Sequence, residues 1–404
     1  MNTAPRQLSL RPLVAALALG ATALPGLAQT VSPYTFSASQ RLSSDSNVFR
    51  RESGREDSDR ISATSVGVAL NQPLGRQQLV ADLNATRYNY SKINQLDNTG
   101  YNALVKLNLA SAADLSGDIS FQQSQAQSAF VLNQTEKNLE QNRVVSARGQ
   151  LGMNSLWALE AGAAVRNVAE SSRAFDDAEL KAKSGNIGVR YRPSDLISFG
   201  LGYRRTNGNY LYGAVDASGN PDEFKRNDID FTTKWTPSDI TAVTARLSKT
   251  DQTHTVRTPR DQSLITSALT MNWKPTGILG VELQWLRDTN EAIGTAGSTL
   301  ETSSSGQAPI TNALQLATNW NWSPAVQGVA RFKVAKRSFD SALGQSGSDN
   351  TRTVSLGVTY LPVRYLAIEL GGARETRSSS NANVTNSNPY DANTAFIGLG
   401  LRLN

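Results

Sequence analysis

The sequence predicts an all-β protein that forms a transmembrane, antiparallel, up-and-down β-barrel of about 18 strands, with short periplasmic turns and long extracellular loops. Three observations lead to this prediction. A turn of one kind recurs along the chain, the strands beside it have one apolar and one polar face, and tight connections alternate with long ones. Only 39% of the 404 residues are hydrophobic and the mean hydropathy is −0.36, so a thick soluble core would be hard to build.

The N-terminal segment, residues 1–28, is typical of a cleavable signal peptide. Arg6 and Arg11 come before an apolar run from Leu13 to Ala23, and small residues follow that run. The run is too short to span a bilayer comfortably, so we prefer cleavage to a retained anchor helix. We expect residues 29–404 to form a single barrel domain in the bacterial outer membrane. The chain has no cysteine, so it cannot form the disulfides that stabilise many exported proteins.

The recurring turn places an aromatic residue two positions before a proline, as in YRPSD, WTPSD, WKPTG, WSPAV and YLPVR. In the strand after the first of these, the apolar residues from Ile197 to Tyr203 alternate with small or polar ones. Alternation alone fits a soluble sandwich as well as a membrane barrel. Aromatic rings favour the headgroup boundary, so we interpret the residues at these strand ends as a membrane-interface girdle: Trp157, Tyr191, Trp235, Trp273, Trp322 and Tyr360.

The connections predict the strand number. We place tight turns near Pro73, Ala112, Asn154, Pro193, Pro237, Pro275, Pro324 and Pro362, and these eight turns join sixteen strands. One further strand at each terminus gives about 18. The polar segments Thr206–Lys225, Asp288–Pro309 and Glu375–Asn393 are expected to be long extracellular loops. A closed barrel pairs every backbone group around the ring, which removes the need for disulfides.

The polar strand faces are expected to line the lumen. Their charged residues are our candidates for contact with a transported molecule: Lys106, Arg148, Arg166, Arg190, Arg204, Lys234, Arg246, Arg331, Lys333, Glu282 and Glu369. Cations outnumber carboxylates among them, in line with the chain's net charge of +6 and pI near 9.5. A basic lumen attracts anionic solutes or an acidic polymer. The alternative is that these charges pair across the lumen and only stabilise it.

The sequence offers little catalytic chemistry. The single histidine, His254, is expected in an exposed polar loop, where Ser248 and Asp251 are its generic neighbours in sequence. With one histidine and no cysteine we predict no enzyme activity, no metal site and no cofactor. No compact basic cluster carries stacking aromatics, so nucleic acid is not expected as a partner.

The N-terminal third carries more specific motifs. SSDSNVFR at Ser43–Arg50, SDRI at Ser58–Ile61 and the segment Gly75–Val105 resemble the outer-membrane β-barrel family of exopolysaccharide biosynthesis and export proteins associated with exosortase-type gene clusters in Gram-negative bacteria. The matching positions are Asp45, Asn47, Phe49, Asp59, Arg76, Gln77, Tyr88, Tyr90, Leu96, Asp97, Tyr101 and Asn102. Taken one at a time, these residues have an alternative interpretation. Asp45 and Asn47 are residue types that shape turns, and the tyrosines are typical of the membrane-interface girdle.

The resemblance implies a passive conduit for an extracellular polysaccharide. Its partners would be outer-membrane lipid, the polysaccharide itself, and synthesis or export components of the periplasm and inner membrane. Two alternatives stay open on the residues alone. One is a general porin, or one selective for sugars or anions, and the other is a surface protein that retains polysaccharide.

Overall fold

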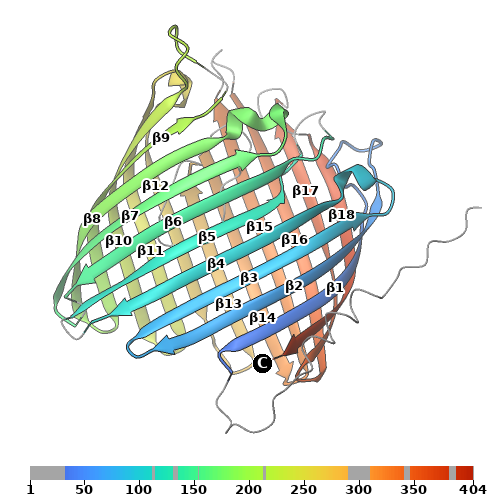
Figure 1. Cartoon of the computed structure of the whole chain (residues 1–404), viewed down its shortest axis with the longest axis horizontal. Helices are drawn as coiled ribbons and strands as arrows, with labels where there is room; N and C mark the ends of the chain where they lie inside the picture. Colours follow the sequence, from blue (N-terminus) through green and yellow to red (C-terminus); the bar gives the residue numbers. More distant parts are fainter. Residues whose placement is uncertain are drawn as a thin grey trace, which may run out of the picture.

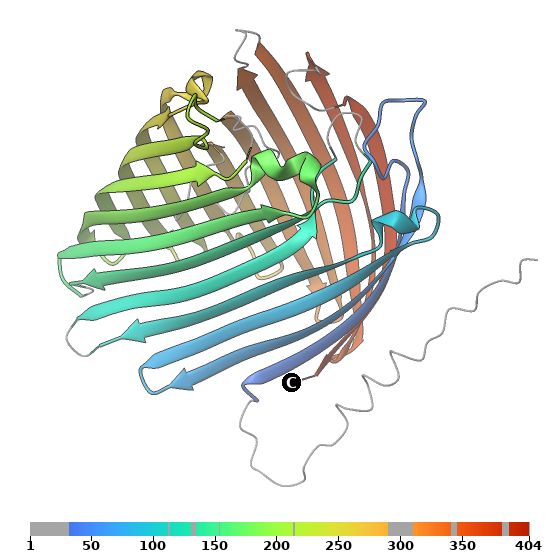
Figure 2. The same cartoon turned by 45° about the horizontal axis from the view of Figure 1, so that its top comes forward.

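The computed structural model describes residues 32–111, 114–130, 135–152, 154–212, 215–289, 310–340, 346–381 and 388–403. They form one closed sheet of eighteen antiparallel strands, in which each strand pairs with its neighbours in sequence and β1 pairs with β18 (Figure 1, Figure 2). The predicted fold class and strand number are confirmed. The predicted signal peptide and its cleavage site lie outside the described residues.

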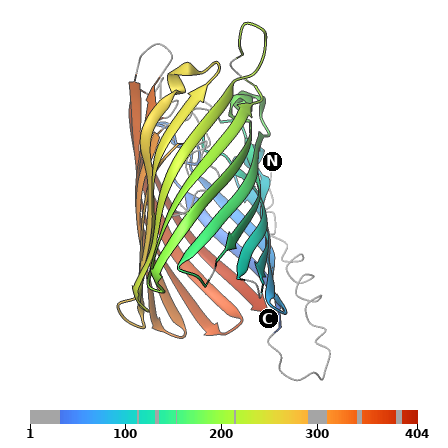
Figure 3. The same cartoon turned by 90° about the vertical axis from the view of Figure 1, so that its left-hand side faces the viewer.

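The strands have the following bounds: β1 Tyr34–Asp45, β2 Asp59–Leu74, β3 Gln77–Tyr90, β4 Asn98–Ala110, β5 Leu115–Gln127, β6 Leu139–Leu151, β7 Trp157–Glu170, β8 Leu180–Ser194, β9 Ile197–Tyr210, β10 Glu223–Ser238, β11 Thr241–His254, β12 Gln262–Trp273, β13 Leu279–Asp288, β14 Ile310–Ser323, β15 Val326–Asp340, β16 Ser346–Val363, β17 Leu366–Ser380 and β18 Tyr390–Leu403. The two ends of the barrel differ. The tight turns gather at the end where β1 begins and β18 ends, and the longer connections gather at the other (Figure 3).

The strands run further toward the long connections than the sequence predicted. The expected loop Thr206–Lys225 shrinks to residues 211–222, and the expected loop Glu375–Asn393 shrinks to residues 381–389. Beyond the apolar band both strand faces are polar, so the alternation that marks a strand disappears while the backbone ladder continues. Most of the third expected loop, Asp288–Pro309, lies outside the described residues, as does the predicted turn position Ala112.

The recurring prolines have a structural reason. Register shifts separate Tyr191 from Ser194, Trp235 from Ser238, and Tyr360 from Val363, and in each case a proline stands inside the shift. Proline has no N–H to donate to the ladder, so it is tolerated at a bulge next to a turn. In three of the five turns the aromatic-x-Pro pattern is therefore the sequence of a bulged strand end.

The outer wall is apolar. Ile187, Leu201, Ile229 and Leu247, on four neighbouring strands, are 65%, 57%, 56% and 52% exposed. A soluble sandwich would bury such residues between two sheets, whereas a barrel turns them toward lipid. Among the described residues, no helix is long and apolar enough to cross a membrane.

Candidate functional site in the barrel lumen

Strand alternation separates the outer wall from the inner one. Each charged residue that the sequence assigns to the lumen alternates with the exposed apolar residues of its strand, and so lies on the inner face. Arg204, for example, follows the exposed Tyr203 on β9 and is 4% exposed itself. Whether these residues contact a transported molecule stays a prediction.

The girdle aromatics lie on the outer face at the tight-turn end. Trp157, Trp235 and Trp322 are 58%, 45% and 55% exposed there. The rings of Trp157 and Tyr191, on the paired strands β7 and β8, lie 4.7 Å apart. Large exposed rings at one level of an apolar wall are what an interfacial aromatic belt requires. Trp273 and Tyr360 are also exposed at this end.

A recess of about 370 Å³ lies on the inner wall between β5 and β11, and we call it the basic recess. Its charged lining comprises five cations, Arg148, Arg190, Arg204, Lys234 and Arg246, and three carboxylates, Asp118, Glu160 and Asp230. Arg190 is clasped by Glu160, with Nη2 3.1 Å from Oε2. Gly200 makes room for it, because a Cβ there would lie 3.2 Å from Arg190 Nη2 and 2.5 Å from Thr232 Oγ1.

Two cations of the basic recess are not held in this way. Lys234 and Arg148 are exposed on the inner wall, and no carboxylate of the described residues lies within salt-bridge distance of either. A cation without a fixed partner keeps its full attraction for a mobile anion. These two side chains give the recess its net positive field.

A second set of charges forms a buried lumenal charge network: Arg204, Arg226, Arg246, Asp228, Asp230 and Asp288. Arg226 is fully buried at its centre, 3.0 Å from Asp228 and 2.9 Å from Asp288. Three arginines face three aspartates, so the network is formally neutral. Hydroxyl groups complete it, with Thr250 donating to Asp228 at 2.6 Å. These contacts are what buried charges need to be stable.

Elsewhere on the inner wall the predicted cations differ in their partners. Lys106 lies 3.8 Å from Asp118, and Arg166 donates to an asparagine of β6 at 3.2 Å. Arg331 and Lys333 on β15 form no ion pair with any carboxylate that the structure describes. The alternative in which lumenal charges pair therefore holds for part of the wall, and attraction of anions by the remaining cations stays a prediction.

The two predicted lumenal glutamates are each engaged. Glu369 lies 2.6 Å from Arg41 of β1, on the seam that closes the barrel. Glu282 accepts a hydrogen bond of 2.7 Å from Gln284 on its own strand.

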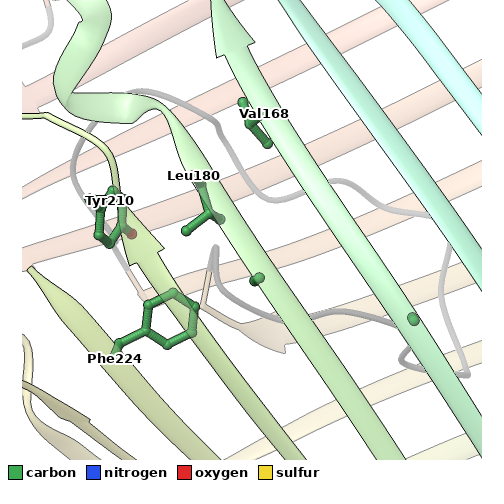
Figure 4. Close-up of a cluster of buried hydrophobic side chains, with 6 residues drawn as sticks. Val168, Leu180, Tyr210 and Phe224 are labelled. Atoms are coloured by element: carbon green, nitrogen blue, oxygen red, sulfur yellow. The ribbon is translucent and has the colours of Figure 1, made fainter.

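The prediction that His254 lies in an exposed loop is wrong. It is the last residue of β11 and is 6% exposed, with Nδ1 2.9 Å from Asp222 and Nε2 3.0 Å from Gln252. Its ring lies beside Tyr210 and Phe224, which belong to the buried cluster shown in Figure 4. The error arose because both faces of β11 are polar near its end.

The groups expected near His254 do not assemble around it. Ser248 donates to Asp230, and Asp251 accepts from Ser263 at 2.6 Å. The carboxylate that does meet the histidine is Asp222. Burial works against ionisation of Asp222, but hydrogen bonds from two backbone N–H groups and from His254 outweigh it, and they hold the pKa of this carboxyl below its usual range.

The family-like residues of the N-terminal third shape the long connections. Asp45 accepts from the N–H of Asn47 at 2.8 Å, and Asn47 donates to the carbonyl of Asp391 at 3.0 Å. Phe49 packs against Leu96 in a small buried cluster. These contacts match the alternative in which such residues shape a turn.

The tyrosines of the same segment divide between the faces. Tyr88 and Tyr90 pair with Ala63 and Ile61 on the inner face of β2, so the prediction that they belong to the girdle is wrong. Tyr101 lies on the outer face, where Gln123 donates to its hydroxyl at 2.6 Å.

Sequence reasoning missed Arg226 and Asp288. Arg226 stands two and four positions before Asp228 and Asp230, so the alternation of the strand already indicates that it lies on the inner face. Asp288 lies 62 positions further on, and only the strand register brings it to Arg226.

No family model matches the chain, and no curated protein matches it. Among solved structures it is similar to OccK2 (OpdF) of Pseudomonas aeruginosa, with a TM-score of 0.51 and 12% identity over 92% of this chain and 98% of that one. A second structure of OccK2, in complex with glucuronate, gives a TM-score of 0.50, 12% identity and the same coverage. At this identity the likeness shows the fold alone, a closed antiparallel β-barrel.

Proposed function

We propose that this chain is an outer-membrane porin through which small anionic solutes diffuse passively. One observation carries the proposal. The basic recess presents Lys234 and Arg148 to the lumen without a carboxylate partner among the described residues, while its other arginines are held in ion pairs. Fixed cations on a water-filled wall raise the local concentration of anions.

The contacts available in the basic recess suit passage. A diffusing anion that meets one or two exposed cations is attracted but not enclosed, and it must be able to leave. The recess holds five cations and three carboxylates, so its net formal charge is about +2 under neutral conditions. An anionic sugar such as glucuronate, which OccK2 binds in its crystal structure, is a suitable first probe.

The porin was an alternative in the sequence analysis, and the shared fold favours it over polysaccharide export. Export, retention of a surface polysaccharide, and the periplasmic and inner-membrane partners rest on the sequence resemblance, which no family model supports. They stay predictions, as does the absence of enzyme activity.

The test is ion selectivity of the purified chain in planar bilayers. Under a KCl gradient we expect a reversal potential that indicates anion preference. The double substitution Lys234→Glu and Arg148→Glu changes the net charge of the recess from about +2 to about −2, so the preference should invert. Lys225→Glu, on the outer face of β10, is the matched control and should leave it unchanged. Absence of conductance, a cation-selective wild type, or a double variant equal to the control would contradict the proposal.

A further inference from the structure

A second recess, of about 350 Å³, lies on the inner wall at the long-connection ends of β3, β4 and β5. We call it the amide recess. Its inward side chains are Asn84, Thr86, Tyr88, Tyr90, Asn98 and Asn102. None of the described residues that line it is charged, which sets it apart from the basic recess. Its volume falls at the lower end of the range for small-molecule sites.

Two residues that line the amide recess, Asn98 and Gln127, each have a buried side-chain oxygen without a hydrogen-bond partner among the described residues, and that of Asn98 belongs to an inward side chain. Asn98 is 4% exposed, and its Nδ2 donates to the carbonyl of Leu96 at 2.9 Å. Its Oδ1 is buried and accepts no hydrogen bond from any residue that the structure describes. A buried acceptor without a donor costs about 1–3 kcal/mol. A ligand hydroxyl that donates to Oδ1 would remove this cost.

An aromatic face lies beside that acceptor. Tyr88 pairs with Asn98 across β3 and β4, and the neighbouring residue on the inner face of β4 is Gly100. A Cβ at Gly100 would lie 3.4 Å from Tyr88 Cε2 and 3.0 Å from the carbonyl of Gln125. The missing side chain therefore leaves space against the edge of the Tyr88 ring. Tyr90, at the long-connection end of the recess, packs against the cluster of Phe49 and Leu96.

We infer that the amide recess binds a neutral saccharide. A sugar ring offers C–H faces that pack on an aromatic ring and hydroxyl groups that both donate to and accept from carboxamides. An anion or a cation would lose hydration here without meeting an opposite charge. The chain would thus hold two lumenal sites of different chemistry, one for anions and one for neutral sugars.

Binding is tested by calorimetry on the full-length protein in detergent, with maltotriose as the neutral probe and glucuronate as the anionic one. We expect heat from maltotriose that saturates in the millimolar range, typical of a weak transport site. Tyr88→Ala, which removes the ring, and Asn102→Ala, at an exposed position of the recess, should each weaken maltotriose binding by about tenfold and leave glucuronate binding unchanged.

The matched control is Gln122→Ala, an exposed inward amide of β5 outside the recess, which should bind maltotriose like the wild type. Asn98→Leu removes the unpartnered acceptor and should also weaken binding. Asn98→Leu also loses the hydrogen bond to the carbonyl of Leu96, so this variant can fail to fold. In that case Asn102→Ala still tests the inference. No maltotriose heat in the wild type, or equal losses in the control and the recess variants, would overturn the inference.

The inference rests on the proposed function only in that solutes must reach the lumen, and the two can fail separately. Saturable maltotriose binding by a chain that carries no current would leave the amide recess standing and overturn the porin. Anion-selective current without maltotriose binding would support the porin and overturn the inference about the amide recess.

Discussion

Replacing Arg226 with methionine removes the centre of the lumenal charge network and tests whether it stabilises the barrel. The guanidinium donates to Asp228, to Asp288 at 2.9 Å and to the hydroxyl of Thr289 at 2.7 Å. Methionine is uncharged and flexible and replaces the aliphatic part of the arginine side chain, so the change mainly removes the guanidinium. It leaves three aspartates facing two arginines in a buried setting.

The size of the loss follows from what remains. Removing one partner of a buried ion pair costs about 3–5 kcal/mol, chiefly because a charge is left uncompensated. Here each carboxylate keeps one arginine, since Arg204 lies 3.2 Å from Asp228 and Arg246 lies 2.6 Å from Asp288. We therefore expect the low end, about 3 kcal/mol of unfolding free energy.

A double substitution makes the prediction specific. Arg226→Met with Asp228→Asn restores neutrality and leaves the Arg204–Asp230 contact of 3.1 Å intact. Its cost should fall short of the sum of the single costs by about 1–3 kcal/mol, as expected for groups in one network. The assay is urea unfolding in lipid vesicles, followed by tryptophan fluorescence, with the exposed Lys225→Met as control. A single variant within about 0.5 kcal/mol of the control, or strictly additive costs, would refute the reasoning.

Three further predictions concern the long-connection end. Because the pKa of Asp222 is depressed, its contribution to stability is present at neutral pH and is lost as pH falls through the acid range below its usual value. Asp222→Asn should weaken the contact with His254 at neutral pH and reduce the pH dependence of acid unfolding; an unchanged acid midpoint would count against this. Gly208→Ala places a Cβ 2.5 Å from the Phe224 ring and should cost about 1–3 kcal/mol in urea unfolding, whereas a neutral effect would show that the ring moves freely. Phe49→Ala should speed proteolysis within residues 46–58 without lowering the unfolding midpoint of the barrel, and equal cleavage rates would show that its cluster does not hold this connection.

The sequence predicted those parts of the barrel that touch lipid. Where one strand face is apolar, as on β9 from Ile197 to Tyr203, the period of two marks the strand and its orientation. Where both faces meet water, as on β11 from Ser248 to His254, the period is lost, and the strand looks like a loop. This is why His254 was placed in solvent although its ring is buried.

The candidate site was predictable residue by residue but not pair by pair. Inward placement of Arg204, Arg226 and Asp228 follows from alternation alone. The pairing of Arg226 with Asp288 depends on the register of β10 to β13, which is set by turns and bulges that a single sequence does not specify. The amide recess was hidden for the same reason, because only the register of β3 and β4 brings Asn98 opposite Tyr88.

The neutrality of the charge network has a consequence for selectivity. Three arginines and three aspartates contribute little net field at the distance of a passing ion, so the field must come from cations without fixed partners such as Lys234 and Arg148. Arg226→Met with Asp228→Asn keeps the network neutral and should therefore leave the reversal potential unchanged, even though it lowers stability. Lys234→Glu should shift the reversal potential toward cation preference and leave the unfolding free energy nearly unchanged. Lys234 is exposed and stabilises no buried carboxylate among the described residues. If the double variant shifted the reversal potential as strongly as Lys234→Glu does, the buried network and not the exposed cations would set the field, and selectivity would depend on how the arginines share their carboxylates.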